Sequence, residues 1–359
     1  MEKLDVKSKT PEELKIIVAG LGFPSFHAKQ LFKWLQTGTE DFNSMSDLPK
    51  ALREKLEENA YIANVEIEQK YVSKIDGTVK YLYKLPDGSY IESVLMKYDG
   101  WYSVCVSSQV GCRMGCKFCA SGIYGLSRSL TPSEILAQVT AAERDNSVRV
   151  SHIVMMGMGE PLDNFQNTVR FLQLVSHPDG LNLSLRNISV STSGLANKIT
   201  ELAKYKMPVT LSVSLHNPIN SERSKIMPVN RSYNIETLLS ACREYIKITG
   251  RRISFEYALI EGVNDSDEHA CLLAKRLRGM ICHVNLIPAN PVVENNFKRS
   301  DGKRVRAFRK KLESLGINAT VRRTLGADIN ASCGQLRRRQ INQQDKSIPN
   351  GGAENENSK

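Results

Sequence analysis

The spacing of apolar and polar residues near the start of the chain predicts three helices. The sequence Thr10-Pro11-Glu12-Glu13 offers an N-cap, a proline at the first helical position and a capping-box glutamate. We expect the helix that it opens to run toward Leu21 and to end at Gly22, because glycine tolerates the backbone conformation that terminates helices. Apolar residues at helical spacing predict two more helices, over residues 26–35 and 48–56.

After these helices the pattern changes to the alternation of apolar and polar residues that is typical of strands. The runs at 78–83 and 90–94 alternate in this way, and Asp-Gly pairs at 76–77 and 87–88 supply hairpin turns. The sequence therefore predicts that residues 1–97 form an N-terminal accessory domain in which helices precede an antiparallel meander.

From residue 98 to 336, strand-like and helix-like segments alternate. Such repeated units predict an α/β fold with parallel strands and right-handed crossovers, and about six of them fit a full or partial (β/α) barrel. In that architecture the functional site forms where the strands end. The predicted strands cover residues 104–106, 152–156, 188–191, 210–214, 253–259, 283–287 and 319–322.

Composition limits the class of protein and its partners. The chain has 359 residues, 41% of them hydrophobic, which is enough for one large domain and a smaller one. Its net charge of +11 favours a polyanionic partner, with nucleic acid ahead of an anionic membrane surface. We see no signal peptide or membrane-spanning run, and eight cysteines suggest reduced thiols, so we expect a cytoplasmic protein. Residues 337–359 begin with three arginines and continue as a polar tail that we expect to be disordered.

Three cysteines at the spacing Cys-x3-Cys-x2-Cys are the strongest chemical signal. Cys112, Cys116 and Cys119 precede the helix start Thr131-Pro132-Ser133-Glu134, so they lie on a loop that can wrap around an iron–sulfur cluster. Three thiolates leave one iron of a four-iron cluster open to a small molecule, and this spacing is the signature of radical S-adenosylmethionine (AdoMet) enzymes. The alternatives are three unconnected thiols or a zinc site, for which no fourth Cys or His follows soon after Cys119. The cysteines without a motif, which we expect to be packing residues, are Cys242, Cys271 and Cys282.

Small and hydrogen-bonding residues collect where the predicted strands end. Each such segment alone is ordinary turn composition, but five in succession suit a polar ligand across the mouth of a barrel. The segments are Gly157-Met158-Gly159-Glu160-Pro161, Ser191-Thr192-Ser193-Gly194, Ser214-Leu215-His216, Glu261-Gly262-Val263-Asn264-Asp265 and Ile287-Pro288-Ala289-Asn290.

Three longer segments carry a resemblance to a known family. They are Ser103-Val104-Cys105-Val106-Ser107-Ser108-Gln109-Val110-Gly111-Cys112, Met156-Gly157-Met158-Gly159-Glu160-Pro161 and Ala331-Ser332-Cys333-Gly334-Gln335-Leu336. With them the chain resembles the RlmN/Cfr family of radical AdoMet enzymes, which methylate an adenine of RNA. The resemblance covers nearly everything from the first hairpins to Leu336, and it implies a radical AdoMet partial (β/α) barrel of the six-unit type.

The resemblance implies roles for three residues in the chemistry. Cys333 would accept a methyl group from one AdoMet as a thiolate, and a second AdoMet on the open iron would yield a 5′-deoxyadenosyl radical that takes a hydrogen from this methyl group. The resulting methylene radical would add to the adenine. Glu92 would then accept the ring proton, and Cys105 would attack Cys333 and release the product through a transient disulfide. Without the resemblance, the residues would suggest that Cys105 packs in the core and that Glu92 is a solvated carboxylate. Cys333 would be a loop cysteine without a chemical role.

The same resemblance implies the cofactors, a [4Fe-4S] cluster on Cys112, Cys116 and Cys119 and two AdoMet molecules per turnover. Gly159 and Glu160 would hold the amino group of AdoMet. The remaining contacts would include the backbone of one leucine and a hydrogen bond from one asparagine to the nucleoside. These residues are Ser191, Ser214, Leu215, His216 and Asn290.

The expected macromolecular partners are 23S rRNA and tRNA. Basic residues crowd the segments 298–311, 322–323 and 337–339, where they could bind phosphates or simply form a solvated surface. The N-terminal unit, with Lys29, Lys33 and Trp34, could grip an RNA stem by shape. The resemblance also suggests a flavodoxin-type electron donor, and we expect a monomer that does not associate with membranes.

Two activities occur in this family. RlmN-like enzymes methylate C2 of one adenosine in 23S rRNA and of adenosine 37 in certain tRNAs, whereas Cfr-like enzymes methylate C8 of the same rRNA adenosine and confer antibiotic resistance. The segments 230–234 and 283–288 resemble RlmN, while 96–101 is also similar to Cfr-like proteins, and we favour C2. An RNA-binding module with a structural metal site is a hypothesis of another class. It explains the charge and the cysteine loop but not the Gly-Glu-Pro motif, Cys105 and Cys333 together.

Overall fold

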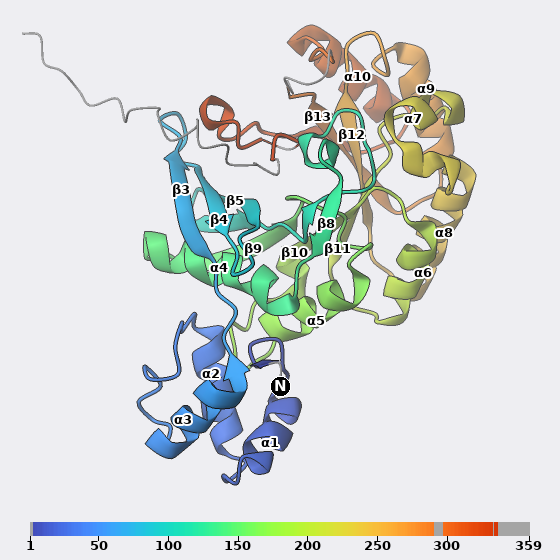
Figure 1. The fold of residues 1–359 in the computed structure, drawn as a ribbon. Helices are drawn as coiled ribbons and strands as arrows, with labels where there is room; N and C mark the ends of the chain where they lie inside the picture. Colours follow the sequence, from blue (N-terminus) through green and yellow to red (C-terminus); the bar gives the residue numbers. More distant parts are fainter. Residues whose placement is uncertain (1–2, 291–296, 333, 337–359) are drawn as a thin grey trace, which may run out of the picture.

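One ten-stranded mixed sheet organises the computed structural model, which describes residues 3–290, 297–332 and 334–336 (Figure 1). Its strands follow the order β14-β13-β12-β11-β10-β9-β6-β5-β4-β3. Neighbours from β14 to β6 are parallel, and those from β6 to β3 are antiparallel. The parallel strands are β6 (Trp101–Cys105), β9 (Val150–Met155), β10 (Ile188–Thr192), β11 (Thr210–Ser214), β12 (Ile253–Leu259), β13 (Cys282–Pro288) and β14 (Ala319–Val321). The antiparallel strands are β3 (Glu66–Val72), β4 (Val79–Lys84) and β5 (Tyr90–Tyr98).

The sheet curves into an open barrel rather than a closed one. Within the residues that the structure describes, β14 pairs with β13 alone, so the parallel part ends in a free edge. The predicted α/β fold with a partial barrel is therefore confirmed. The predicted strands at 210–214 and 253–259 match β11 and β12 at both ends.

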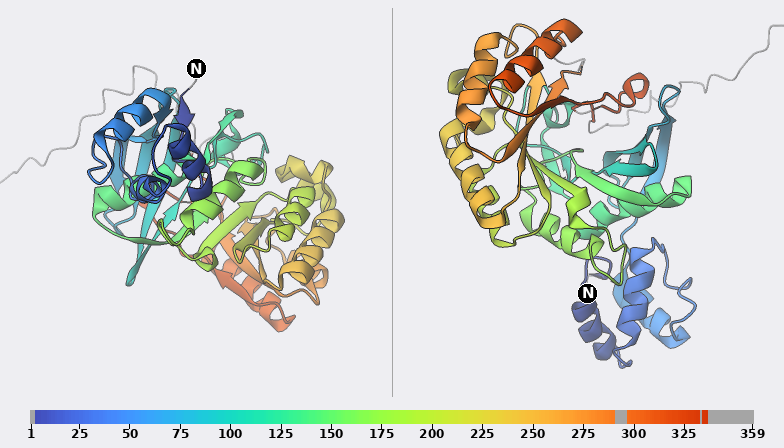
Figure 2. Two further views of the ribbon diagram at one scale, coloured as in Figure 1. Left: turned by 90° about the horizontal axis from the view of Figure 1, so that it is seen from below. Right: turned by 180° about the vertical axis from the view of Figure 1, so that it is seen from behind.

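Helices connect the parallel strands and cover the outer face of the sheet (Figures 1 and 2). Thr131 and Glu134 form the predicted capping box at the start of α4, with each side chain accepting a hydrogen bond from the backbone amide of the other. The apolar faces of the helices and strands form one large core. These helices are α4 (Pro132–Asn146), α5 (Phe165–Val175), α6 (Ala196–Lys204), α7 (Asn220–Ile226), α8 (Ile235–Thr249), α9 (Asp267–Leu277) and α10 (Gly302–Ser314).

The N-terminal helices build a second core of their own below the sheet in Figure 1. The Thr10 capping box is present, and α1 ends at Gly20, close to the predicted end. An ion pair between Arg170 and Glu13, with N–O distances of 2.9 and 3.0 Å, joins this unit to α5. The elements of the unit are β1 (Leu4–Asp5), α1 (Pro11–Gly20), α2 (His27–Gln36), α3 (Lys50–Asn59) and β2 (Ala60–Tyr61).

The meander that follows these helices belongs to the main sheet, since β5 hydrogen-bonds to β6 and runs through residue 97. The division into domains at 1–97, 98–336 and 337–359 stays a proposal, and the last of these ranges lies outside the described residues.

The C-terminal segment 322–336 crosses from the end of β14 to the hairpin strands, as Figure 1 and the right panel of Figure 2 show in orange-red. Its anchor is the turn between β3 and β4. The carboxylate of Asp328 accepts hydrogen bonds from Ser73 Oγ at 2.7 Å and from the Lys74 amide at 3.0 Å. The amide of Gly326 donates to Asp76 at 2.9 Å. The segment that carries the Ala-Ser-Cys-Gly-Gln-Leu motif is thus fixed to the opposite edge of the sheet.

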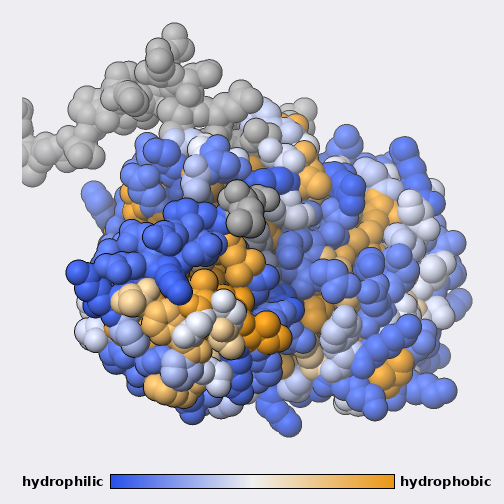
Figure 3. Space-filling model, turned by 60° about the horizontal axis from the view of Figure 1, so that its bottom comes forward, coloured by the Kyte–Doolittle hydropathy of each residue, from blue (hydrophilic) through white to orange (hydrophobic). Residues whose placement is uncertain are grey.

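The surface is mostly polar, with apolar side chains in small groups on the face that Figure 3 shows. No helix among the described residues is long and apolar enough to cross a membrane.

Candidate active site

A small hairpin holds the three clustered cysteines. Strands β7 (Gln109–Gly111) and β8 (Leu126–Ser129) pair antiparallel, and the cysteine loop lies between them with one 3₁₀ turn over Ala120–Gly122. Gly111 has φ of +80°, and a Cβ there would lie 2.0 Å from the carbonyl oxygen of Gly125. Only glycine fits this crossing of two backbones, which fixes where the loop begins.

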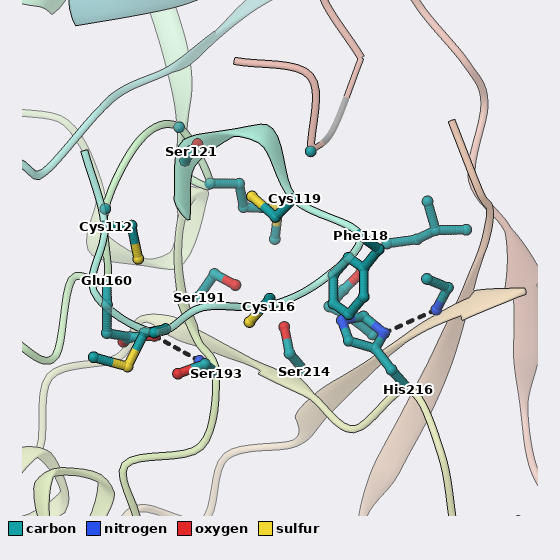
Figure 4. Close-up of a pocket in the computed structure, with 18 of the residues that line it drawn as sticks. Cys112, Cys116, Phe118, Cys119, Ser121, Glu160, Ser191, Ser193, Ser214 and His216 are labelled. Carbon is teal, nitrogen blue, oxygen red and sulfur yellow. Dashed lines mark hydrogen bonds between the residues drawn. The ribbon is translucent and has the colours of Figure 1, made fainter. Parts of the chain in front are cut away.

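The three predicted cluster cysteines line one open cavity of about 1040 Å³, which we call the cysteine cavity (Figure 4). Burial raises the pKa of the Cys112 thiol to about 12 and that of Cys116 further. These thiols therefore need a bound cation to become thiolates. Among the described residues no three His, Cys, Asp or Glu side chains are arranged to bind a single metal ion. The sequence spacing of the three cysteines suits a cluster, in which each thiolate binds a different iron.

The opposite wall of the cysteine cavity is made by the carboxyl ends of β9, β10, β11 and β13. Six of the seven residues that were predicted to bind AdoMet lie in this wall, namely Gly159, Glu160, Ser191, Ser214, His216 and Asn290. The seventh, Leu215, is fully buried and is not part of the lining. Its amide donates to the carbonyl of Glu256 and its carbonyl accepts from Arg223, so both backbone groups serve the core.

Glu160 connects the ends of β9 and β10. Its side chain is 3% exposed, and its two oxygens accept hydrogen bonds from the amides of Leu162 at 3.0 Å and Ser193 at 2.6 Å. Burial raises the pKa of this carboxyl, and the hydrogen bonds that it accepts lower it. Gly159 makes the position possible, because its φ is +101° and a Cβ would lie 2.6 Å from Cβ of Gln109. A fixed carboxylate in a cavity wall is suited to an ammonium group.

His216 faces Phe118 of the cysteine loop edge-on, with ring centroids 4.7 Å apart. The backbone fixes the ring, since the amide of Ala258 donates a hydrogen bond to Nδ1 at 2.9 Å. Burial and the charge of Arg223 lower the pKa of His216 to about 3. The imidazole therefore stays neutral and can present an Nε2–H donor to the cavity.

A second cavity of about 580 Å³, the Cys105 cavity, adjoins the first. Met156, Ile287, Asn290 and Arg322 line both. Cys105 and Ser332 line the Cys105 cavity, and Gly334 lines the cysteine cavity. Cys333 itself lies outside the described residues, but the residues on either side of it each border one of the two cavities.

Glu92 lies on β5, on the same face of the sheet as Val94, which lines the Cys105 cavity. It is 1% exposed, so the interpretation as a solvated carboxylate is wrong. Its Oε1 lies 3.0 Å from Nζ of Lys80.

Comparison with known proteins gives these cavities a context. Residues 106–274 match the Radical SAM superfamily, and residues 4–62 match the ribosomal RNA large subunit methyltransferase N-terminal domain. The chain is 50% identical to a probable dual-specificity RNA methyltransferase RlmN of Clostridioides difficile (strain 630), over 94% of this chain and 98% of that protein. It is 48% identical to a protein of the same name from Alkaliphilus oremlandii, over 95% and 99% of the two chains. The chain belongs to the RlmN family of radical AdoMet RNA methyltransferases.

A solved structure supports the same family. The crystal structure of a radical SAM methyltransferase from Sphaerobacter thermophilus matches with a TM-score of 0.89 and 44% identity, over 93% of this chain and 99% of that one. RlmN membership makes the chain an enzyme, so the hypothesis of a non-enzymatic RNA-binding module is wrong.

An RlmN-type enzyme implies a [4Fe-4S] cluster and AdoMet, and the cysteine cavity fits both. Three thiols, a carboxylate, hydroxyls and a neutral imidazole line it together (Figure 4). Ser193 is 8% exposed and lines the cavity, and its hydroxyl lies beside the Glu160 carboxylate.

Two residues of this RlmN site were not assigned from the sequence. Ser193 lay in a noted segment, but nothing marked it apart from its neighbours. Arg223 on α7 is fully buried, and its guanidinium donates to the carbonyls of Leu215, Ser193 and Ser214 at 2.9 Å and to Asn230 Oδ1 at 2.8 Å. It fixes the backbone where β10 and β11 end. No local sequence signal identifies it, because its partners come from separate crossover units.

Proposed function

We propose that this enzyme methylates C2 of an adenosine in 23S rRNA and of adenosine 37 in tRNAs, with Cys333 as the methyl-carrying residue. The observation that carries the proposal is the pair of adjoining cavities. One is lined by Cys112, Cys116 and Cys119, the other by Cys105, and the chain on either side of Cys333 borders both. The proposal assigns the cofactors to the first cavity and the resolving thiol to the second.

The cofactors occupy the cysteine cavity in this proposal. Cys112, Cys116 and Cys119 hold the [4Fe-4S] cluster, and Glu160 and Gly159 hold the amino group of AdoMet. Contacts with the rest of AdoMet come from Ser191, Ser193, Ser214, His216 and Asn290, while Leu215 acts only by shaping the backbone. When bound, the cluster and two AdoMet molecules per turnover supply the methyl group and the one-electron chemistry that makes it reactive toward an aromatic carbon.

The remaining chemistry belongs to three side chains of this enzyme. The thiolate of Cys333 accepts the methyl group and later joins it to C2 of the adenine. Glu92 takes the C2 proton. Because Glu92 is buried, this proton does not exchange freely with solvent water. The thiolate of Cys105 attacks the sulfur of Cys333 and a disulfide forms. The bond between that sulfur and the transferred carbon breaks with its electron pair on the carbon, which takes up a proton and becomes the methyl group of the product.

Substrate RNA contacts the basic surface of α10 and the N-terminal helices. In α10, exposed Lys303, Arg306 and Lys310 have no acidic partner among the described ion pairs, whereas Arg304 and Arg309 pair with Asp267 and Glu313. The unpaired cations can bind phosphates. We further propose a cytoplasmic monomer that receives electrons from a flavodoxin-type donor.

The C2 product is favoured over the Cfr-type C8 product because the similar proteins carry the name RlmN. Digestion of treated 23S rRNA and tRNA to nucleosides, followed by mass spectrometry against standards, tests this choice. We expect 2-methyladenosine, and 8-methyladenosine alone would overturn it.

Cysteine variants test the proposed roles separately from the product. Cys333→Ala should abolish methylation and keep the iron content, and Cys105→Ala should accumulate an RNA–protein adduct. Cys271→Ala is the matched control, because Cys271 proves to be exposed rather than packed and lies outside both cavities. Methylation by Cys333→Ala would refute the two-step scheme.

A further inference from the structure

A buried lysine connects the proposed proton acceptor to the segment that carries Cys333. Lys80 lies on β4, where its side chain is 4% exposed. Its Nζ is 3.0 Å from Glu92 Oε1 and donates a hydrogen bond to the carbonyl oxygen of Asn330 at 3.1 Å. Lys80 is opposite Val94 in the antiparallel register, so it shares one face of the sheet with Glu92. One ammonium group thus contacts both β5 and the C-terminal segment.

This arrangement costs more free energy of desolvation than a purely structural contact requires. A lysine and a glutamate withdrawn from water each lose several kcal/mol of hydration, and a well-packed apolar pair of similar volume would often be at least as stable. Asn330 is also in the left-handed backbone region, with φ of 51°, at the point where its carbonyl meets Lys80. An ion pair that persists at such a position invites a functional explanation.

The C-terminal segment does not depend on Lys80 for its attachment. Asp328 binds Ser73 and Lys74, and the Gly326 amide binds Asp76, all at the turn between β3 and β4. These contacts attach the segment at the turn, away from the face of the sheet on which Lys80 and Glu92 lie. Lys80 adds a contact on the inner face, next to Glu92, and the two kinds of contact can be removed separately.

We propose that Lys80 is a positioning residue that sets the position of the Glu92 carboxyl group relative to the C-terminal segment on either side of Cys333. The inference rests on the proposed function, in which Glu92 takes the C2 proton of the adenine joined to Cys333. The adduct formed by the methylene radical has one unpaired electron, which passes to a one-electron acceptor, a role that the oxidised cluster would fill when bound. The C2–H bond breaks, its electron pair stays in the purine ring, and Glu92 becomes the neutral acid. The ion pair with Lys80 holds the Glu92 side chain, and the hydrogen bond from Lys80 to Asn330 fixes the position of that side chain relative to the C-terminal segment.

The test compares Lys80→Met and Lys80→Arg with the wild-type enzyme, each reconstituted with iron and sulfide. We expect Lys80→Met to keep the cluster content and AdoMet cleavage but to lose at least tenfold in methylated RNA, while the covalent RNA–protein adduct accumulates on denaturing gels. Lys80→Arg keeps the charge and should recover most of the product. A merely structural lysine would not give an adduct that the arginine variant removes.

The matched control is Asp328→Asn, which weakens the other attachment of the same segment without touching Glu92. Product formation near the wild-type level in this variant, beside the loss in Lys80→Met, supports the proposal. Equal losses in both variants, or no loss in Lys80→Met, would overturn it. Because Lys80→Met leaves Glu92 buried without this partner, the double variant Lys80→Met/Glu92→Gln provides a second measurement. If it restores the thermal stability of the wild type but not product formation, the loss is chemical, and if it restores neither and forms no adduct, the proposal fails.

Failure of the proposed function has a different signature. If Glu92→Gln alone methylates RNA at the wild-type rate, Glu92 is not the proton acceptor, whatever the Lys80 variants do.

Discussion

The amide of Ala258 donates a hydrogen bond to Nδ1 of His216 at 2.9 Å and thereby fixes the tautomer of that ring. A backbone amide can only donate, so Nδ1 is unprotonated and the ring proton lies on Nε2. The depressed pKa of about 3 means that the ring carries no charge at any pH at which AdoMet binding would be measured. His216 is therefore a neutral donor in the wall of the cysteine cavity.

This depressed pKa predicts how stability depends on pH. The unfolded chain protonates His216 below its ordinary pKa of about 6.5, while the folded chain does not do so until about pH 3. The contribution of His216 to stability is thus present above pH 6.5 and is lost as the pH falls toward 3, by about 1.4 kcal/mol per pH unit. Denaturant unfolding between pH 7 and 5 should show a smaller loss of stability for His216→Asn than for the wild type. Identical slopes would mean that the ring is solvated.

Gly159 is expected to be intolerant of any side chain. Its φ is +101°, and a Cβ at this position would lie only 2.8 Å from the backbone nitrogen of Gln109, which leaves no room for Ala. Gly159→Ala should lower the free energy of unfolding by about 2 kcal/mol or more and weaken AdoMet binding, because the Glu160 carboxylate moves with it. Gly262→Ala is the control, since Gly262 has φ of +68° but open space around it. A cost of about 1 kcal/mol is expected there, and equal costs in both variants would contradict the steric argument.

The three cysteines of the cavity should be needed for iron, and the exposed one should not. Cys116→Ser removes a partly buried thiol from the cysteine cavity, whereas Cys271→Ser changes an exposed side chain on α9. After anaerobic reconstitution we expect Cys116→Ser to lose most of its iron, sulfide and visible absorbance, and Cys271→Ser to keep them. Retention of a full cluster by Cys116→Ser would exclude this residue as a ligand.

Arg223 should be important for stability although it need not contact substrate. Four oxygen acceptors share its guanidinium, and Arg223→Met removes this donor from all of them, although the Leu215 carbonyl keeps a second donor in the Asn217 amide. We expect the free energy of unfolding to fall by about 3 kcal/mol or more. Arg309→Met, on the exposed face of α10, should change it by less than about 0.5 kcal/mol. Chemical denaturation measures both, and a small effect at Arg223 would mean that water can replace the guanidinium.

RNA binding should depend on those cations of α10 that are not already paired. Replacing Lys303 and Lys310 with Gln should reduce the slope of log affinity against log salt by up to about 0.9 for each phosphate that the variant no longer binds. Arg309→Gln removes a charge that already pairs with Glu313 at 2.8 Å, so its slope should stay close to that of the wild type. Filter binding of a 23S rRNA fragment at several salt concentrations provides the measurement. An unchanged slope in the double variant would place the RNA on another surface.

The sequence by itself determined those features that depend on neighbouring residues. The capping boxes at Thr10 and Thr131, the order of strands and helices, and the loop with three cysteines all follow from residues a few positions apart. Six of the seven residues expected to contact AdoMet line one cavity, because residues that follow parallel strands meet at one edge of the sheet. Their contact with AdoMet stays a prediction. Leu215, between Ser214 and His216, is buried in the core instead. Successive residues of a strand face opposite sides, so two neighbours in the cavity wall do not imply that the residue between them lines it.

Only the tertiary structure decided which distant groups meet. Lys80 and Asn330 are 250 residues apart in the chain, Arg223 and Ser193 are 30 apart, and His216 and the Ala258 amide are 42 apart. The burial of Glu92, the neutral state of His216 and the hydroxyl of Ser193 within the cavity depend on these encounters. Hydrogen bonding and desolvation act over a few ångströms of space, and the chain order of the residues does not determine which of them come that close.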